Sequence, residues 1–240
     1  QAQVAGGEVD VLLVSPERLN NPVFRDEVLP HLAAGAALVV IDEAHCISDW
    51  GHDFRPDYRR IATLLAGLPP RTPVLATTAT ANRRVSADIA EQLGASLDAA
   101  GADGEQVLVL RGTLERGSLH LGVRMLPDAA SRLAWLTAYI RCAHGSGIIY
   151  CLTVSAAQEV AEHLRAAGAE VAAYTGQTDA AERERLEEDL KANRVRALVA
   201  TSALGMGFDK PDLAFVVHLG APSSPVSYYQ QVGRAGRGVE

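Results

Sequence analysis

The sequence predicts an α/β fold with two lobes, each a parallel sheet flanked by helices. Three observations lead to this prediction. Short apolar runs recur along the chain, helix-like amphipathic segments lie between them, and a stretch without periodicity separates the runs into two series. The runs are continuous rather than alternating, which is typical of strands buried on both faces of a parallel sheet.

The apolar runs predict the individual strands. In the first series these are "VLLV" (11–14), "LVVI" (38–41), "VLA" (74–76) and "VLVL" (107–110). In the second they are "GIIYC" (147–151), "EVAAY" (170–174), "RALVA" (196–200) and "AFVVH" (214–218). A helix is expected between 155 and 168, with Ser155 as its N-cap and Gly168 as its C-cap. The stretch 111–130, rich in Gly and Arg, predicts an interdomain linker, and we expect lobes of residues 1–118 and 119–240.

Composition restricts the possible classes of protein. The longest apolar runs are strand-sized, so we expect no membrane span, and the N-terminal residues do not resemble a signal peptide. Three cysteines without CxxC spacing favour reduced cytosolic thiols over disulfides or a zinc site. The net charge of −7 argues mildly against nucleic-acid binding. Much of the acid, however, lies in 180–194, where the interleaved charges indicate a solvated helix face.

The stretch "IDEAHCISDWGHDFRPDY" (41–58) carries the chemistry of the first lobe. Asp42 and Glu43 directly follow an apolar strand, and ligands of parallel sheets bind where strands end. Two acids at this place could hold Mg²⁺ through water and orient a nucleophilic water. A lone Asp-Glu pair is also common as a helix cap.

The longer motifs resolve this ambiguity by resemblance. Residues 42–45, "DEAH", resemble motif II of superfamily-two helicases, and 46–58 closely resemble the aromatic-rich loop of RecQ-family DNA helicases. "SPERL" (15–19) resembles motif Ib and "TTATA" (77–81) motif III. Residues 200–238 resemble RecQ motifs V and VI in the right order and spacing. The resemblance covers nearly the whole chain and implies that both lobes are RecA-like.

The resemblance implies roles for the motif II residues. Asp42 would hold Mg²⁺ through water, and Glu43 would polarise the water that attacks the γ-phosphate. His45 would couple the nucleotide state to motif III, in which Thr78 and Thr80 are the coupling residues. Without the motif, His45 would be interpreted as a capping or packing histidine.

A further set of residues is expected to bind DNA. Aromatic side chains between polar neighbours are suited to stacking on bases, which tolerates any sequence. Trp50 could instead anchor the loop onto its domain. The expected DNA-binding residues are Trp50, His52, Phe54, Arg55, Arg18 and Thr201.

The second lobe contributes two arginines to the predicted site. Arg234 and Arg237 are three residues apart, which on a helix places both on one face. The resemblance implies that they are arginine fingers for the γ-phosphate, whereas GRxGR alone could equally be a nucleic-acid patch. The predicted nucleotide-binding residues of this lobe are Gln230, Gly205, Gly207 and Asp209, with Asp209 as the ribose contact.

One expected motif is not in the sequence. The only lysines are Lys191 and Lys210, and neither lies in GxxxxGK[ST], the loop that cradles the β- and γ-phosphates. We therefore expect a fragment of a helicase core, with an incomplete first lobe and no C-terminal zinc-binding or winged-helix region. Activity is expected of the intact parent rather than of residues 1–240.

The resemblance implies an ATP-dependent DNA helicase of the bacterial cytosol or nucleoid. It would use ATP and Mg²⁺, translocate 3′ to 5′ on single-stranded DNA and unwind duplex junctions during DNA repair and recombination. Two alternatives remain open at this point. One is an RNA helicase of the DEAD/DEAH type, and the other is a non-catalytic nucleic-acid-binding module that has lost nucleotide binding.

Overall fold

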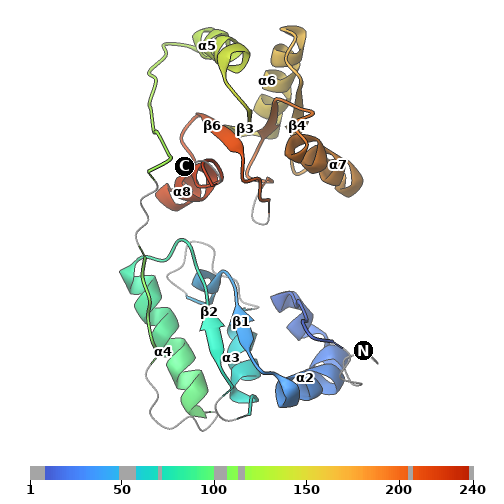
Figure 1. Cartoon of the computed structure of the whole chain (residues 1–240), viewed down its shortest axis with the longest axis vertical. Coiled ribbons are helices and arrows are strands. Elements are labelled where there is room, and N and C mark those ends of the chain that lie inside the picture. Colours follow the sequence, from blue (N-terminus) through green and yellow to red (C-terminus); the bar gives the residue numbers. More distant parts are fainter. Residues whose placement is uncertain are drawn as a thin grey trace. The chain divides into compact units, whose positions relative to one another are not determined.

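The computed structural model describes residues 9–48, 58–69, 72–99, 107–112, 117–204 and 208–237. The chain divides into two compact units, residues 1–112 and 113–240 (Figure 1). Among the described residues, no helix has both the length and the apolar character needed to span a bilayer.

The first unit is built around two parallel strands. Its elements are the 3₁₀ helix η1 (Pro16–Asn20), the π-helical turn η2 (Phe24–Val28), α2 (Leu29–Gly35), β1 (Val39–Ile41), the 3₁₀ helix η3 (Ala44–Ile47), α3 (Arg59–Ala66), β2 (Val74–Ala76) and α4 (Arg83–Ala99). Strands β1 and β2 pair in parallel, with Val39 opposite Val74 and Ile41 opposite Ala76. Both strands therefore end at the same edge of the sheet.

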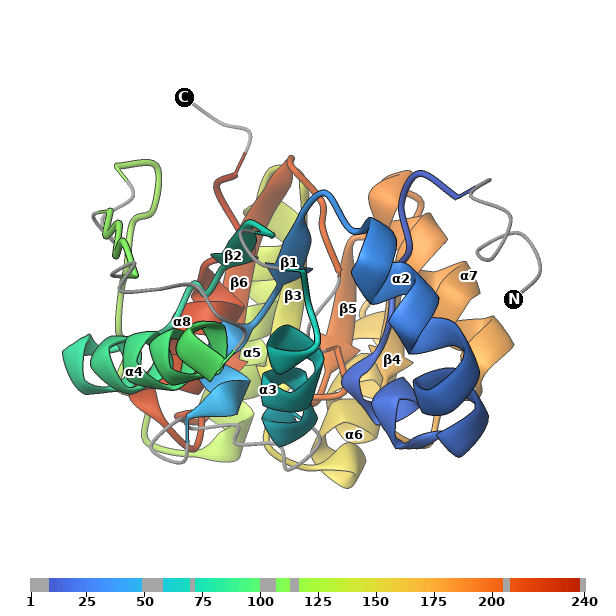
Figure 2. The same ribbon diagram turned by 90° about the horizontal axis from the view of Figure 1, so that it is seen from below.

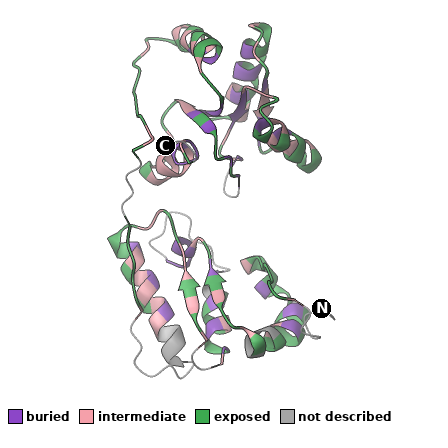
Figure 3. Cartoon of the chain, in the orientation of Figure 1, coloured by how far each residue is buried: buried purple, intermediate pink, exposed green. Residues whose placement is uncertain are grey.

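The core of the first unit lies on one face of this sheet. Ile41 packs with Leu65 of α3 and Ile89 of α4 in a single apolar cluster. The other face carries Val40 and Leu75, which are about half exposed. Exposed parts of both strands are visible in Figure 3. Within the described residues, the first sheet is thus covered on one face only, unlike the sheet buried on both faces that the continuous apolar runs predict.

Two strands predicted for the first unit are wrong. Residues 11–14 and 107–110 form neither helix nor strand, and most of their apolar side chains are exposed, with Leu13 at 92% and Leu108 at 79%. An apolar run becomes a strand only when a neighbouring strand supplies its hydrogen-bond ladder. No such ladder to either run is formed within the described part of the chain.

The second unit has a larger sheet. Its elements are α5 (Ala129–Cys142), β3 (Ser146–Cys151), α6 (Val154–Ala166), β4 (Val171–Tyr174), α7 (Ala180–Lys191), β5 (Ala197–Ala200), β6 (Leu213–Leu219) and α8 (Pro225–Val232). All four strands are parallel, in the order β4-β5-β3-β6, which can be followed across Figure 2. The four strands predicted for this unit are confirmed to within one residue at each end.

Both faces of the second sheet are buried. Ile149 of β3 packs with α5 and α6, whereas its neighbour Ile148 packs with α7 on the opposite face. Ile148, Ile149 and Leu198 are fully buried. Successive side chains of a strand point to opposite faces, so a strand covered on both sides must be apolar throughout.

The helix termini show how local sequence sets the boundaries. Helix α6 begins after Thr153, whose hydroxyl accepts a hydrogen bond from the Ala156 amide at 3.1 Å, so Thr153 and not Ser155 is the N-cap. Its C-cap is Ala167, and Gly168 follows with φ of +86°, a conformation that favours glycine. Helix α7 confirms the predicted charged surface helix, because Glu182 pairs with exposed Arg185.

Candidate active site

Asp42 and Glu43 lie where β1 ends, beside the end of β2. The Thr77 amide donates to the Ile41 carbonyl and the Ala44 amide to the Thr77 carbonyl, both at 2.9 Å, so the pairing continues past the strands. Oδ1 of Asp42 accepts from the Thr77 hydroxyl at 2.8 Å and from the Glu43 amide at 2.9 Å. These two donors orient an exposed carboxylate through its Oδ1.

Glu43 adopts a backbone conformation that is uncommon for its residue type. Its φ of 50° and ψ of 42° lie in the left-handed region, which costs a non-glycine residue about 1–3 kcal/mol. The 3₁₀ helix η3 begins immediately after it, and the Cys46 amide donates to the Glu43 carbonyl at 2.9 Å. The turn therefore holds a strained residue at the sheet edge, a common feature of functional sites.

His45 connects the two strand ends. Its side chain is buried, and Nδ1 lies 3.1 Å from the Thr78 hydroxyl and 3.5 Å from the Thr80 hydroxyl. The same Nδ1 lies 3.1 Å from Oε2 of Glu43, yet this buried oxygen makes no hydrogen bond of acceptable geometry within the described residues. We interpret His45 Nδ1 and Glu43 Oε2 as a close contact without a hydrogen bond. The imidazole nitrogen pairs with the Thr78 hydroxyl, and the Glu43 oxygen can accept a hydrogen bond from another donor.

The carboxylates fit a Mg²⁺ ion that is held jointly with a nucleotide. Magnesium prefers oxygen ligands, keeps several waters and is bound by one or two carboxylates together with substrate phosphates. Asp42 and Glu43 supply such oxygens, and the buried Oε2 of Glu43 still lacks a hydrogen-bond donor among the described residues. No cluster of three or more His, Cys, Asp or Glu side chains forms an all-protein metal cage in the described ranges.

The predicted aromatic contacts cannot be compared with the structure. Trp50, His52, Phe54 and Arg55 lie outside the described residues. The residues on either side of this segment are described and buried: Ser48 precedes it and Tyr58 follows it, with the Tyr58 hydroxyl 3.5 Å from the Asp42 carbonyl oxygen.

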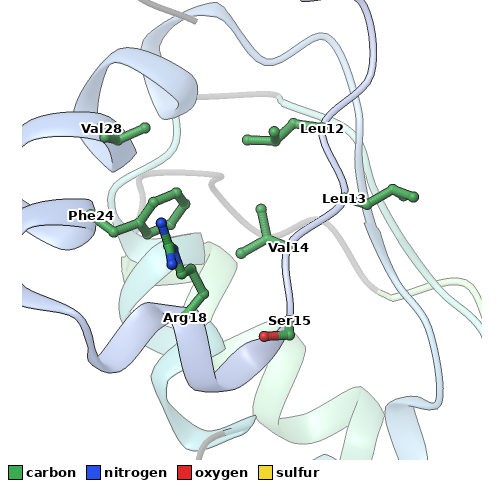
Figure 4. Close-up of a pocket in the computed structure, with 7 residues that line it drawn as sticks. All are labelled: Leu12, Leu13, Val14, Ser15, Arg18, Phe24 and Val28. Carbon is green, nitrogen blue, oxygen red and sulfur yellow. The ribbon is translucent and has the colours of Figure 1, made fainter. Parts of the chain in front are cut away.

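Arg18 lies at a separate place in the first unit. Its guanidinium carbon is 5.8 Å from the centre of the Phe24 ring. Both residues line a pocket of about 390 Å³ with Leu12, Leu13, Val14, Ser15 and Val28 (Figure 4). The pocket shares no lining residue with the carboxylate site, so its geometry does not place Arg18 beside Asp42.

The two arginines of the second unit occupy different environments. Arg234 is buried, and its Nη1 donates to the Phe208 carbonyl at 2.8 Å. Arg237 is 42% exposed in its side chain and donates from Nη1 to Oδ1 of Asp209 at 2.8 Å. The structure thus brings together Arg237 and Asp209, two of the predicted nucleotide-site residues, while Gly205 and Gly207 lie outside the described residues.

A polar network connects β6 to α8, the helix that precedes these arginines. Nε2 of His218 lies 2.7 Å from Oε1 of Gln231, and its ring stacks on Tyr150 with centroids 5.4 Å apart. Burial lowers the pKa of His218, an effect that the bond to Gln231 partly offsets. Burial also raises the pKa of Tyr150, and the nearby Arg234 guanidinium opposes this. Gln230 lies on α8, next to this network.

Thr201 caps the loop that follows β5. Its hydroxyl accepts from the Ala203 amide at 3.3 Å, and its own amide donates to the Tyr174 carbonyl at 3.3 Å. The first bond shapes the loop, and the second joins the end of β5 to the end of the neighbouring strand β4.

Both halves of the chain match helicase families. Residues 1–89 match the family described as "DEAD/DEAH box helicase", and residues 131–239 match "Helicase conserved C-terminal domain". The chain is 36% identical over 239 residues to the ATP-dependent DNA helicase RecQ of Haemophilus influenzae, an alignment that covers 99% of the chain. The chain belongs to the RecQ family. It is also 33% identical over 227 residues, 94% of the chain, to the probable ATP-dependent DNA helicase RecS of Bacillus subtilis.

The chain corresponds to only part of these RecQ-family proteins. It spans 36% of the length of the Haemophilus protein and 43% of the Bacillus protein. In the Haemophilus case the matched part is therefore about a third of the relative.

Solved structures show that the fold is that of RecA-like helicase lobes. Mycobacterium smegmatis helicase Lhr, solved with single-stranded DNA and AMP-PNP, matches with a TM-score of 0.72 at 23% identity and covers 99% of the chain and 31% of Lhr. Saccharomyces cerevisiae Dbp5, solved with RNA and ADP BeF3, matches with a TM-score of 0.65 at 22% identity, covering 83% of the chain and 50% of Dbp5. The predicted fold class, parallel sheets flanked by helices in RecA-like lobes, is confirmed.

Sequence reasoning missed several residues at this RecQ-family site. Thr77, which orients Asp42, lies in the quoted "TTATA", and its position directly after β2 was the signal that could have identified it. The hydroxyl of Ser48 donates to the carboxylate of Asp88 on α4. No local pattern indicates a contact between residues 40 positions apart.

Proposed function

We propose that the chain forms the motor core of an ATP-dependent DNA helicase that couples ATP hydrolysis to unwinding. The observation that supports this most directly is the Asp42–Glu43–His45 arrangement. Two carboxylates stand at the carboxyl end of β1, and Nδ1 of His45 lies close to Glu43 and to Thr78 and Thr80 beyond β2. In a RecQ-family chain, this geometry suits phosphoryl transfer, which requires positioning and charge stabilisation more than covalent chemistry.

The carboxylates have distinct roles in the proposal. Asp42 is held by Thr77 and holds Mg²⁺ through water, while Glu43 orients the water that attacks the γ-phosphate. A bound Mg²⁺ would neutralise charge on the phosphate oxygens. The buried Oε2 of Glu43 is available to accept a hydrogen bond from such a water, because no described residue donates to it.

His45 is proposed to communicate the state of this site. Its Nδ1 lies close to Oε2 of Glu43 and to the hydroxyls of Thr78 and Thr80, so a water bound to that oxygen would change the surroundings of this nitrogen and thereby affect residues 78–80. Residues 49–57 leave the same turn in the sequence. We propose that Trp50, Phe54, His52 and Arg55 bind DNA, with Arg18 and Thr201 as further contacts.

The second unit is proposed to supply positive charge and the remaining nucleotide contacts. Arg237 is exposed enough to reach a ligand, and Asp209, its partner, is 61% exposed. We propose that Arg237 stabilises the γ-phosphate in the transition state and that Asp209 contacts the ribose. Gln230, Gly205 and Gly207 complete the proposed nucleotide set.

Single-stranded DNA is the proposed track, with 3′ to 5′ translocation and a role in repair and recombination within the cytosol or nucleoid. Support for DNA comes from the relatives, several of which are named DNA helicases, and from Lhr, which was solved with single-stranded DNA. The similarity of fold to Dbp5, which was solved with RNA, does not favour RNA, because at 22% identity it concerns the fold alone.

The test is an unwinding assay on a duplex with a 3′ single-stranded tail, with the full-length protein, ATP and Mg²⁺. We expect strand separation with the 3′ tail and none with a 5′ tail. Glu43→Gln should abolish hydrolysis and unwinding while ATP binding is retained, because the amide keeps the shape but loses the water-orienting charge. An unwinding rate for this variant equal to that of the wild type would remove Glu43 from the mechanism, and a wild type without DNA-stimulated ATPase would refute the proposed function.

A further inference from the structure

Asp88 links the turn after motif II to helix α4. Its Oδ2 accepts a hydrogen bond from the hydroxyl of Ser48, and its Oδ1 accepts from Nε2 of Gln92 at 3.1 Å. Ser48 is fully buried, and Gln92 lies one helical turn beyond Asp88 on α4. Both oxygens of one carboxylate are therefore engaged, one by its own helix and one by a residue 40 positions away.

The contact is placed on rigid elements at both ends. The neighbours of Asp88 on α4, Val85 and Ile89, are buried in the apolar core of the first unit. At the other end, the Ser48 amide donates to the His45 carbonyl at 3.3 Å, so Ser48 closes the turn that carries His45. Hydrogen bonds to an ionised carboxylate are about twice as strong as neutral ones, and a buried partner strengthens them further.

The position in the chain gives this contact its significance. Ser48 immediately precedes the segment 49–57, and α4 begins shortly after Thr80, the last of the threonines that contact His45. Ser48 is joined to His45 through the turn and to α4 through Asp88.

We propose that Asp88 is a positioning residue that fixes the Ser48 end of the aromatic-rich segment to α4, so that binding of single-stranded DNA by this segment changes the geometry of His45 and stimulates ATP hydrolysis. The inference rests on the proposed function. It assigns no contact between Asp88 and either ATP or DNA, because Asp88 acts through Ser48.

The experiment is a double-mutant cycle in the full-length protein with the variants Asp88→Ala, Ser48→Ala and the pair. Basal ATPase, ATPase at saturating single-stranded DNA and DNA affinity are measured for each. Both single variants should keep basal ATPase within about twofold and lose stimulation by about tenfold, the effect of removing one hydrogen bond to a charged group. The double variant should be no worse than either single variant, because all three lack the same bond.

The matched control is Glu91→Ala, which removes an exposed carboxylate from the same helix. The ATPase activity of this variant should be stimulated by single-stranded DNA as strongly as that of the wild type. Asp88→Leu, which removes both acceptor oxygens at similar volume, serves if the alanine variant fails to fold, and its loss of stimulation should match that of Ser48→Ala. Normal stimulation in Ser48→Ala and Asp88→Leu, or losses that add in the double variant, would overturn the inference and leave the proposed function intact. A wild type without DNA-stimulated ATPase would instead refute the proposed function.

Discussion

Arg237 is an exposed arginine whose side chain forms few contacts within its own unit. It donates to the exposed carboxylate of Asp209 and to the Gly233 carbonyl at 3.1 Å. An exposed pair of this kind stabilises a fold by about 0–1 kcal/mol. We expect Arg237→Ala to leave the melting temperature nearly unchanged and to slow DNA-stimulated ATP hydrolysis by about 10³-fold or more, the effect of removing an arginine finger.

The measurement that separates this role from DNA binding is a DNA titration of steady-state ATPase. A phosphate-contacting arginine would lower DNA affinity, and low salt would restore it. Turnover of Arg237→Ala that recovers fully at saturating DNA would therefore contradict the finger assignment.

Arg234 should behave differently from Arg237, although both belong to the same sequence motif. Its guanidinium is buried and donates to the Phe208 carbonyl, the residue before Asp209. Arg234→Ala leaves this buried carbonyl without its donor, which costs about 1.5–3 kcal/mol. We expect a lower melting temperature together with slower hydrolysis, since Asp209 loses its support. An unchanged melting temperature with impaired hydrolysis would instead favour direct action on the nucleotide.

At the scale of elements, β6 and α8 are connected through His218, a partly buried histidine of β6 whose Nε2 lies 2.7 Å from Oε1 of Gln231. Burial lowers the pKa of His218 below its usual value of about 6.5. Below about pH 6.5, His218 binds a proton more readily in the unfolded chain than in the folded chain. The contribution of His218 to the free energy of unfolding is therefore fully present above that pH and is lost as the pH falls toward the folded pKa. Titration of this one group can change the free energy of unfolding by at most about 1.4 kcal/mol per pH unit.

The corresponding prediction compares urea denaturation at pH 7.5 and pH 5.5. The wild type should lose more stability on acidification than His218→Gln, because glutamine can hydrogen-bond Gln231 but does not titrate in this range. The carboxylates are common to both proteins and cancel in the difference. Equal losses in the two proteins would show that His218 does not control the pH dependence.

Element boundaries were predictable where one local rule decides them. Ile148, Ile149 and Leu198 are fully buried in a sheet covered on both faces, so a continuous apolar run sufficed to identify β3 and β5. For 11–14 and 107–110 the same kind of run predicted strands that do not form. The sequence of a run specifies its apolar character, whereas a strand also requires a neighbour at the correct distance, which the run itself does not encode.

The site was predictable to a similar extent. The carboxylate pair after a strand and the position of "TTATA" are visible in the sequence, and the structure places His45 within reach of Thr78. The Ser48–Asp88 bond and the burial of Arg234 were not visible, because both depend on how distant segments pack. Arg234 and Arg237 each follow a glycine in the same motif, so their local sequence does not distinguish their environments. The difference arises from tertiary packing.

At the scale of the whole molecule, the printed sequence contains Asp42 and Glu43 but no phosphate-binding loop of the GxxxxGK[ST] type. Residues 1–240 contain no GxxxxGK[ST] segment, and the buried ammonium of Lys210 pairs with Asp212 at 2.6 Å while Lys191 pairs with Glu188 at 2.9 Å. In P-loop enzymes the loop backbone and its lysine cradle the β- and γ-phosphates. Neither lysine of this chain is placed in such a loop.

A protein consisting of residues 1–240 should therefore show negligible ATPase activity with or without single-stranded DNA, because Asp42 and Glu43 have no means to hold the phosphates in line with a water. Phosphate release is the measurement, and Glu43→Gln in the same 240-residue protein gives the background. The non-catalytic alternative predicts the same result for these residues, so DNA binding is measured in parallel, and the full-length protein separates the two. DNA-stimulated ATP turnover by the full-length protein, but not by residues 1–240, supports the helicase motor. DNA binding without turnover in either protein supports a binding module. Turnover by residues 1–240 above the Glu43→Gln background would show that another group in this chain replaces the phosphate loop.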